Sequence, residues 1–217
     1  MGRWTWKSIR GLSGNKVGTI KPDKFWQWNY QACKMRDKFL KNFFVMKKTD
    51  TLNRIYCKGG KTMNDNVMKD HLHCICEQYY DSLTKLAFSY MKNMFDAQDI
   101  VQEVFMSYIK TQPSFESEEH ERSWLLRVTI NKCKDSLKGA WRKNKVEVIW
   151  CTPPPQENIE LLSTVMALPE KYRIPVHLFY YEDMSIGEIA ELIHEKPATV
   201  GTRLARARKI LKDSFAE

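Results

Sequence analysis

Basic side chains near the C-terminus are the residues of this chain best suited to bind a polyanion. Between Lys196 and Lys212 the sequence holds six Lys or Arg and neither Asp nor Glu. Apolar residues recur in this stretch at helical spacing, so one helix face would be buried and the opposite face open. The open face carries Thr199, Thr202, Arg203, Arg206, Arg208 and Lys209. A helix of this kind fits the major groove of DNA, where such side chains bind phosphates and base edges.

A shorter helix is expected just before this one and would position it. Ser185 and Glu188 have the spacing of a capping box, and Pro197 suits the first turn of a new helix. The stretch 185–211 therefore predicts a helix, a tight turn and a second helix. The alternative is a solvated helix whose cations only complement its C-terminal end. Here the cations begin in the first half of the helix, where the macrodipole favours acids, so we favour DNA binding.

A second basic row lies on a long helix expected after a loop at 111–117, with Ser117 as its cap. At spacings of four, three, four and four, the row consists of Arg127, Asn131, Lys134, Lys138 and Arg142. Apolar residues from Trp124 to Trp141 occupy the other side of the helix. A charge run can be a plain solvated face. The separation of the two rows, with an Asn among the bases, favours contacts with nucleic acid.

The helix expected before that loop has an acidic outer face. Asp96 stands where an N-cap belongs, and Pro113 prevents the helix from continuing. The outer face carries Asp99, Gln102 and Glu103. Between Asp96 and Glu121 there are seven acids and one base. Such a face repels DNA and attracts a basic protein surface, and a plain solvated face is the alternative.

Composition places the chain among globular proteins, with 217 residues, of which 43% are hydrophobic and 28% charged. The net charge of +9 comes from residues 1–62, which carry +12, whereas residues 63–217 carry −3. Residues 1–62 are either a weakly ordered cationic arm that binds nucleic acid nonspecifically or a segment upstream of a native start at Met63 or Met68. The sequence has neither a run of 18 apolar residues nor a secretory signal, so we expect a cytoplasmic protein.

A cluster of His71, His73, Cys74 and Cys76 raises the question of zinc. Alternate residues point to different sides of a helix, and no second ligand pair with finger spacing follows. We therefore favour ordinary helix residues and expect neither a metal nor a cofactor. The sequence also lacks a glycine loop for phosphate and a nucleophile motif, which argues against an enzyme.

The helical periods predict an all-α fold of two small helical domains joined by a proline-containing linker. We place the basic N-terminal extension at 1–62, the first domain at 63–143, the linker at 144–156 and the second domain at 157–217. Three consecutive prolines, Pro153 to Pro155, extend the linker.

Four segments resemble the extracytoplasmic-function sigma factors, the smallest members of the bacterial sigma-70 family. In order they are DAQDIVQEVFMSYIK (96–110), RSWLLRVTINKCKDSL (122–137), ALPEKYRIPVHLFYYEDMSIGEIAELI (167–193) and TVGTRLARARKIL (199–211). The resemblance covers about 63–217, and the four motifs occur in the family's order and spacing. It implies that the two domains are sigma region 2, a helical bundle, and sigma region 4, a helix-turn-helix. Such proteins bind RNA polymerase core, recognise the −10 and −35 promoter elements and promote DNA melting without catalysis of their own.

The resemblance also implies roles for individual residues. The contacts with the largest subunit of core polymerase would include Asp96, Asp99, Gln102 and Glu103, and region 4 would pack on the second-largest subunit. The −10 contacts would be Gln112, Ser114 and Phe115, in a loop that holds a flipped base, with Arg127, Asn131, Lys134, Lys138 and Arg142. The −35 contacts would be Lys196, Pro197, Ala198, Thr199, Thr202, Arg203 and Arg206.

The sequence departs from the family pattern in the helix-turn-helix. His194 stands where glycine is common, so a left-handed conformation there would carry some strain. Lys196 replaces the usual Ser or Thr cap, and Gly201 inside the second helix costs about 1 kcal/mol relative to alanine. A helix-turn-helix regulator that binds operator DNA without polymerase remains the alternative, although it does not need the acidic face. The family further suggests an anti-sigma partner.

Overall fold

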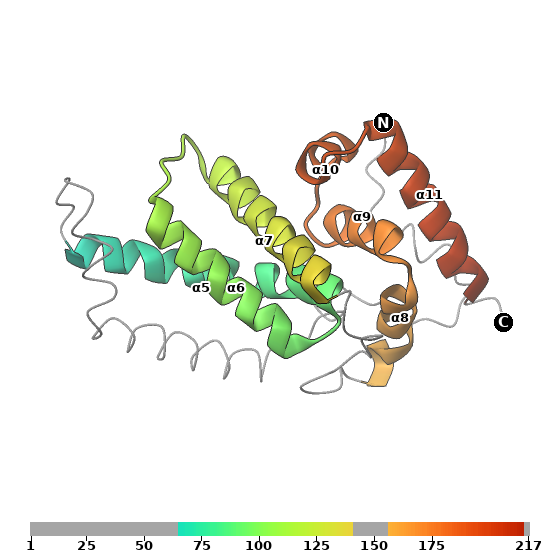
Figure 1. The fold of residues 1–217 in the computed structure, drawn as a ribbon. Coiled ribbons are helices and arrows are strands. Elements are labelled where there is room, and N and C mark those ends of the chain that lie inside the picture. The colour runs from blue at the N-terminus through green and yellow to red at the C-terminus, as the bar shows by residue number, and fades with distance from the viewer. Residues whose placement is uncertain (1–64, 141–155, 215–217) are drawn as a thin grey trace.

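The computed structural model describes residues 65–140 and 156–214 of the protein. In these two ranges every regular element is an α-helix (Figure 1). The helices are α5 (Asp65–Met91), α6 (Met94–Thr111), α7 (Glu118–Ala140), α8 (Gln156–Ala167), α9 (Glu170–Tyr180), α10 (Ile186–Ile193) and α11 (Pro197–Ser214). The predicted all-α fold is confirmed. The expected extension at 1–62, Arg142 and nearly all of the expected linker lie outside the described residues.

Helices α5, α6 and α7 pack against one another and form what we call the first bundle. Each presents an apolar stripe to the shared core, as the spacing of three and four residues predicts. The largest fully buried side chains of this bundle include Tyr80, Phe88, Phe105, Leu125, Leu126 and Ile130. Burying one side chain of this size stabilises the fold by about 1.5–3 kcal/mol, so the bundle is held mainly by these contacts.

The start of α6 corrects one expectation. The N-cap is Asn93 and not Asp96, because the Asn93 side chain accepts a hydrogen bond from the Phe95 backbone N–H at 3.0 Å. Asp96 lies in the first turn of the helix, where its charge complements the macrodipole. Ser117 acts as expected before α7, since its hydroxyl accepts a hydrogen bond from the His120 N–H.

Helices α8 to α11 form the second bundle. Helix α11 packs on α8, α9 and α10, and its buried residues are Val200, Leu204, Ala207 and Leu211. The capping box at the start of α10 is confirmed: the Ser185 hydroxyl accepts from the Glu188 N–H, and the Glu188 carboxylate accepts from the Ser185 N–H. Pro175 lies inside α9, as expected from the sequence.

The two bundles are in direct contact. Helix α5 packs against α9, and α7 packs against α10, so the helix-turn-helix lies beside the first bundle (Figure 1). None of the described helices is long and apolar enough to cross a membrane.

We predict that Ser185→Ala lowers the free energy of unfolding by about 1 kcal/mol, because the N-terminal turn of α10 loses its side-chain acceptor. Denaturant unfolding followed by circular dichroism measures the change. Ser136→Ala, at an exposed site in α7, is the matched control and should leave stability within about 0.5 kcal/mol of wild type. Equal stability of Ser185→Ala and wild type would contradict the capping role.

Candidate functional site

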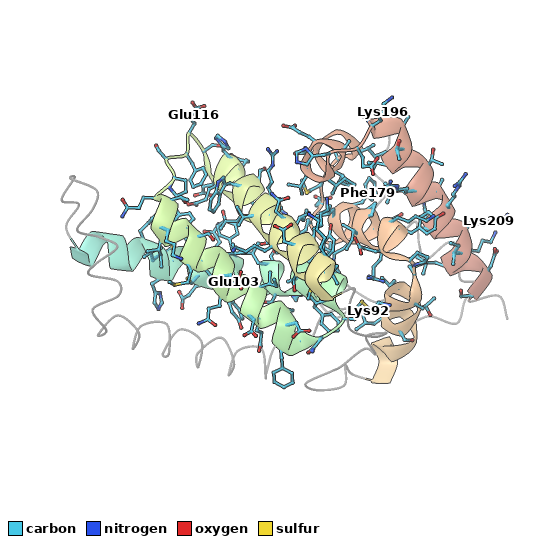
Figure 2. The ribbon with its side chains drawn as sticks, viewed as in Figure 1. Lys92, Glu103, Glu116, Phe179, Lys196 and Lys209 are labelled. Carbon is cyan, nitrogen blue, oxygen red and sulfur yellow. The ribbon has the colours of Figure 1, made fainter. Side chains whose placement is uncertain are left out.

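Helix α6 presents an acidic face, made of Asp96, Asp99, Gln102 and Glu103, away from the core. Asp99 and Glu103 are exposed, and Asp96 and Gln102 are partly exposed. The opposite side of the helix is buried. The Glu103 side chain is 63% exposed although its carboxylate lies 3.1 Å from the Lys132 ammonium of α7 (Figure 2). An ion pair this open to water contributes little, so Glu103 can exchange its partner.

The basic row on α7 remains accessible along its described length. Asn131 and Lys138 are exposed, and Arg127 and Lys134 are partly exposed. Lys138 pairs with Asp135 on the same helix at 2.9 Å. The Arg127 guanidinium lies 3.8 Å from the Glu191 carboxylate of α10, so the second bundle reaches this row.

The loop between α6 and α7 separates the three residues expected to hold a base. Gln112 and Ser114 are exposed, and Gln112 ends α6 in a left-handed conformation with φ 42°. Phe115 is half-buried. Its ring centroid lies 6.1 Å from that of Tyr108 and 5.9 Å from that of Trp124. The Phe115 ring therefore anchors the loop to the first bundle, while the other two side chains are open to a ligand.

A polar contact beneath this loop was not anticipated from the sequence. The Tyr108 hydroxyl donates a hydrogen bond of 2.6 Å to the buried Glu121 carboxylate, and His71 Nε2 lies 3.3 Å from the same hydroxyl. Burial and the hydrogen bond to Glu121 raise the pKa of Tyr108. The contact joins α5, α6 and the first turn of α7, so it holds the two ends of the loop together.

The His and Cys cluster on α5 is split by the helix. Cys76 is buried, Cys74 is exposed, and His73 lies 3.5 Å from the Glu77 carboxylate. Among the residues that the structure describes, no group of three or more His, Cys, Asp or Glu is placed to hold a metal. The absence of a metal site stays a prediction.

The turn of the helix-turn-helix has the strained residue that the sequence suggested. His194 ends α10 in the left-handed region, with φ 59° and ψ 49°. This conformation lets the Glu195 N–H reach the Ala190 carbonyl at 2.8 Å. Lys196 then directly precedes α11, and the turn places the start of that helix at the surface.

The first half of α11 is the open part of the second bundle. Lys196, Pro197, Ala198, Thr202 and Arg206 are exposed, and Thr199 and Arg203 are partly exposed. The Arg203 guanidinium donates a hydrogen bond of 2.6 Å to the Glu195 carboxylate, which orients it. Figure 2 shows Lys196 at the start of α11 and Lys209 farther along the same helix, both on the other side of the view from Glu103 on α6. The acidic face and this basic helix thus lie on different parts of the molecule.

Comparison with family models divides the described residues into two parts, which correspond to the first and the second bundle. The Sigma-70 region 2 model matches residues 75–143, and the Sigma-70 region 4 model matches residues 158–211. The first match contains the acidic face, the loop and the basic row, and the second contains the helix-turn-helix.

Curated relatives agree with the family models. The chain is 31% identical over 153 residues to the RNA polymerase sigma factor SigV of Bacillus subtilis, a match that covers 64% of this chain and 87% of that protein. It is 26% identical over 164 residues to the ECF RNA polymerase sigma factor SigW of the same organism, which covers 66% of this chain and 88% of the relative.

Two solved structures have a similar fold. The sigma factor RpoE of Bartonella quintana, solved in complex with the anti-sigma factor NepR, has a TM-score of 0.56 and 20% identity, covering 63% of this chain and 91% of that chain. CnrH, solved in complex with the cytosolic domain of CnrY, has a TM-score of 0.51 and 23% identity, covering 65% of this chain and 85% of that chain. At these identities the likeness concerns the fold alone.

We predict that Gly201→Ala raises the free energy of unfolding by about 1 kcal/mol, because alanine favours the helix. A Cβ added at Gly201 meets no atom within 4 Å in the part of the chain that the structure describes, so the gain carries no steric cost. Thermal unfolding measures it. Ala205→Gly, at an exposed position of the same helix, is the reverse control and should lose a similar amount. A destabilised Gly201→Ala would show that this position has a constraint beyond helix propensity.

Proposed function

The chain belongs to the extracytoplasmic-function sigma factors of the sigma-70 family, and from this premise we propose which of its surfaces meet polymerase and which meet the promoter. Its function is that of an RNA polymerase sigma factor. The observation that carries the assignment of surfaces is the separation of charge, with one acidic face on α6 and basic rows on α7 and α11.

The acidic face is the proposed contact with RNA polymerase core. Asp99 and Glu103 are exposed on a helix whose other side fills the core of the first bundle. Carboxylates held on a rigid helix attract a basic protein surface and steer its approach. The single pairing of Glu103 with Lys132 is exposed, so it is readily exchanged for a pairing with the partner.

The loop and the basic row of α7 are the proposed −10 contacts. Opening a duplex costs stacking and pairing energy, which a protein can offset by holding the separated strand in a basic groove and an unstacked base in a pocket. Gln112 and Ser114 are exposed and can contact such a base. Phe115 packs against Tyr108 and so holds the loop against the first bundle. Asn131, Lys134 and Lys138 would follow the strand along α7.

The start of α11 is the proposed −35 contact. Recognition helices read base edges with their N-terminal residues, and here Pro197, Ala198 and Thr202 are exposed at that end. Arg206 follows one turn later and is exposed. The division into a region 2 domain at 63–143 and a region 4 domain at 157–217, joined by the linker at 144–156, would let the two DNA contacts move independently.

This function also bears on catalytic activity, cellular location and a protein inhibitor. The family consists of sigma factors, which are not enzymes, so we infer that the chain has no catalytic activity of its own. It would work in the cytoplasm, where polymerase and chromosome are found. The similar structures of RpoE and CnrH contain NepR and the cytosolic domain of CnrY, which supports a protein inhibitor of the anti-sigma class for this chain as well.

We predict that Asp99→Lys combined with Glu103→Lys weakens binding to polymerase core by at least about tenfold, because like charges then meet across the interface. Binding of fluorescently labelled core and transcription from a cognate promoter measure the effect. Glu77→Lys reverses an exposed carboxylate of α5 outside the acidic face and should bind core as wild type does. DNA binding that regulates transcription without any need for core would instead identify a polymerase-independent regulator.

We predict that Arg206→Ala weakens promoter binding by the holoenzyme. It should also reduce the slope of log affinity against log salt concentration by about one, as expected for the loss of one phosphate contact. A titration of binding against salt concentration measures the slope. A promoter shortened so that it lacks the −35 duplex is the control, and on it the variant and wild type should bind equally. Equal loss on both promoters would place Arg206 outside the −35 contact.

A further inference from the structure

Tyr108, near the end of α6, holds the loop between α6 and α7 at three places. Its backbone carbonyl accepts a hydrogen bond of 2.9 Å from the Gln112 N–H, where the loop begins. Its ring stacks on the Phe115 ring in the middle of the loop, with an interplanar angle of 28°. Its hydroxyl donates a hydrogen bond of 2.6 Å to Glu121 in the first turn of α7. One residue therefore connects the beginning, the middle and the far side of the loop.

The Tyr108 hydroxyl is itself held from two sides. Tyrosine has one hydroxyl proton, and Tyr108 donates it to the Glu121 carboxylate. The hydroxyl oxygen is then left as an acceptor for His71 Nε2, which lies 3.3 Å away on α5. Burial, followed by the hydrogen bond and the charge of Glu121, raises the pKa of Tyr108, so the hydroxyl keeps the proton that it donates. Three helices thus fix the position of this one oxygen.

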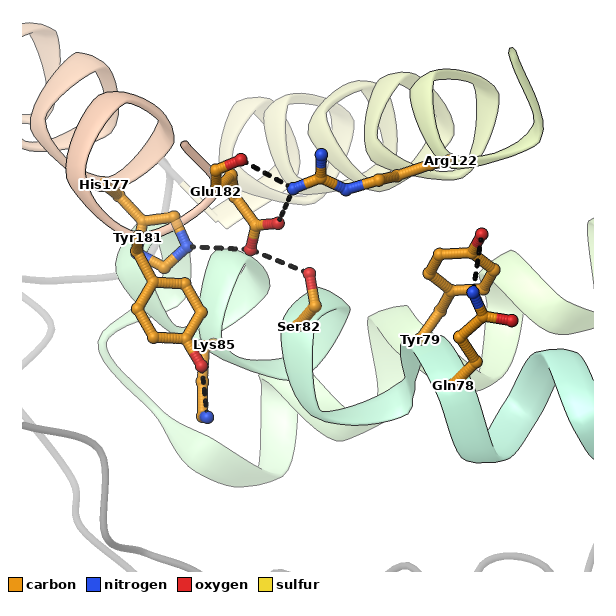
Figure 3. A network of polar contacts seen from close by, with 8 residues as sticks. All are labelled: Gln78, Tyr79, Ser82, Lys85, Arg122, His177, Tyr181 and Glu182. Carbon is orange, nitrogen blue, oxygen red and sulfur yellow. Dashed lines mark hydrogen bonds and ion pairs between the residues drawn. The ribbon is translucent and has the colours of Figure 1, made fainter. Parts of the chain in front are cut away.

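Arg122 follows Glu121 in the sequence but has a different partner. Consecutive helix residues point in different directions, and the Arg122 guanidinium donates a hydrogen bond of 2.7 Å to the Glu182 carboxylate (Figure 3). The hydrogen bond donor that the structure gives to the buried Glu121 carboxylate is the Tyr108 hydroxyl. A buried carboxylate that loses its donor carries the full cost of desolvation, so this contact resists opening.

The hydrogen bond fixes the Tyr108 ring more narrowly than its aromatic contacts do. Ring centroids lie 6.1 Å apart between Tyr108 and Phe115, and 5.7 Å apart between Tyr108 and Trp124. Aromatic pairs are favourable over a range of about 4.5–7 Å, which leaves the rings room to slide. An O–H···O hydrogen bond is favourable only over about 2.5–3.0 Å. The hydroxyl contact therefore decides where the ring lies, and the ring decides where Phe115 and the loop lie.

The start of the loop adopts a conformation that needs support. Gln112 has φ 42° and ψ 56°, in the left-handed region that non-glycine residues adopt at some cost. Such a conformation persists where the surrounding structure holds it. The side chains of Gln112 and Ser114 are exposed, so their positions follow from the loop backbone. Support of that backbone by Tyr108 thus reaches the two side chains that are proposed to contact a base.

We propose that Tyr108, fixed by Glu121 and His71, is a positioning residue that sets the loop for base capture before DNA binds. The proposal rests on the −10 contact proposed above. Tyr108 is 5% exposed, so it acts through the loop and not by touching DNA. A loop that already has its bound shape loses less freedom on binding, and the apparent affinity rises with the fraction of molecules in that shape.

The test measures binding of single-stranded DNA by holoenzyme assembled from core polymerase and the full chain. The probe is a fluorescent oligonucleotide with the non-template −10 sequence of a promoter that this holoenzyme transcribes. Versions with one abasic site are compared position by position, and the site that weakens wild-type binding most identifies the captured base. A single strand needs no melting, so its binding reports on capture.

Tyr108→Phe keeps the ring and removes the hydroxyl. The variant should bind the intact strand about tenfold more weakly than wild type, as expected for losing a hydrogen bond to a charged group. On the strand that lacks the captured base, the variant and wild type should bind equally, because the loop has no base to hold. A purely structural defect would weaken binding to both strands alike, so the difference between strands isolates the positioning role.

Tyr80→Phe is the matched control. Tyr80 is another buried tyrosine of the first bundle, and its hydroxyl is hydrogen-bonded to Gln98 near the start of α6. Gln98 precedes the loop by 14 residues, which is about 21 Å along the helix. Tyr80→Phe should therefore keep the wild-type preference for the intact strand over the abasic one, even if it lowers stability.

A double variant separates positioning from stability. Tyr108→Phe combined with Glu121→Met replaces both partners by apolar groups, so no buried carboxylate loses its donor and stability should stay near that of wild type. The double variant should still lose the preference for the intact strand, because the directional contact is gone. Should Tyr108→Phe fail to fold, as judged by circular dichroism, this double variant decides the question.

The outcomes separate this proposal from the proposed function. A folded Tyr108→Phe or double variant with the wild-type preference for the intact strand overturns the positioning role, as does an equal loss on both strands. In either case the wild-type holoenzyme still captures a base, so the proposed −10 contact stands. A wild-type holoenzyme whose binding no abasic site weakens would instead refute the −10 contact of the loop.

Discussion

Burial of the apolar side of α7 is the constraint on which the rest of the structure depends. Leu125, Leu126, Ile130 and Cys133 are all at most 1% exposed, and they hold α7 against α5 and α6. Once that side is buried, the basic row can only face outward. The same packing turns the acidic face of α6 to solvent, because its own apolar side shares this core. The separation of charge on the surface is therefore a consequence of how the core is filled.

The contacts inside each bundle differ in chemistry from the polar contacts between the two bundles. Inside each bundle, side chains such as Phe105 and Leu178 are fully buried among apolar neighbours, and exposing them to water is costly. Between the bundles, charged groups such as Glu182 and Arg173 meet partners across the contact. These groups regain hydrogen bonds to water on separation. These polar contacts add to the apolar core, whose buried residues form one cluster that includes side chains of both bundles.

Local signals explain which parts of the fold could be predicted from the sequence. The capping box of Ser185 and Glu188 was predicted, because its two partners are three residues apart and need no other element. The start of α6 was predicted wrongly, because Asn93 and Asp96 are both good caps and the sequence does not rank them. The left-handed conformation of His194 was anticipated because this residue stands where glycine is common in a helix-turn-helix.

The sequence by itself determined the helices, their apolar sides and the charge of their open faces, since periods of three and four residues report on a single helix. The tertiary structure alone decided which distant residues meet. Ser82 and Glu182 are 100 residues apart, and Arg122 and Glu182 are 60 apart, so no local pattern indicates their pairing. Likewise, only packing against Tyr108 and Trp124 turned Phe115 inward from a loop that looked open. Such contacts depend on how the helices pack together, which the period of any one helix does not specify.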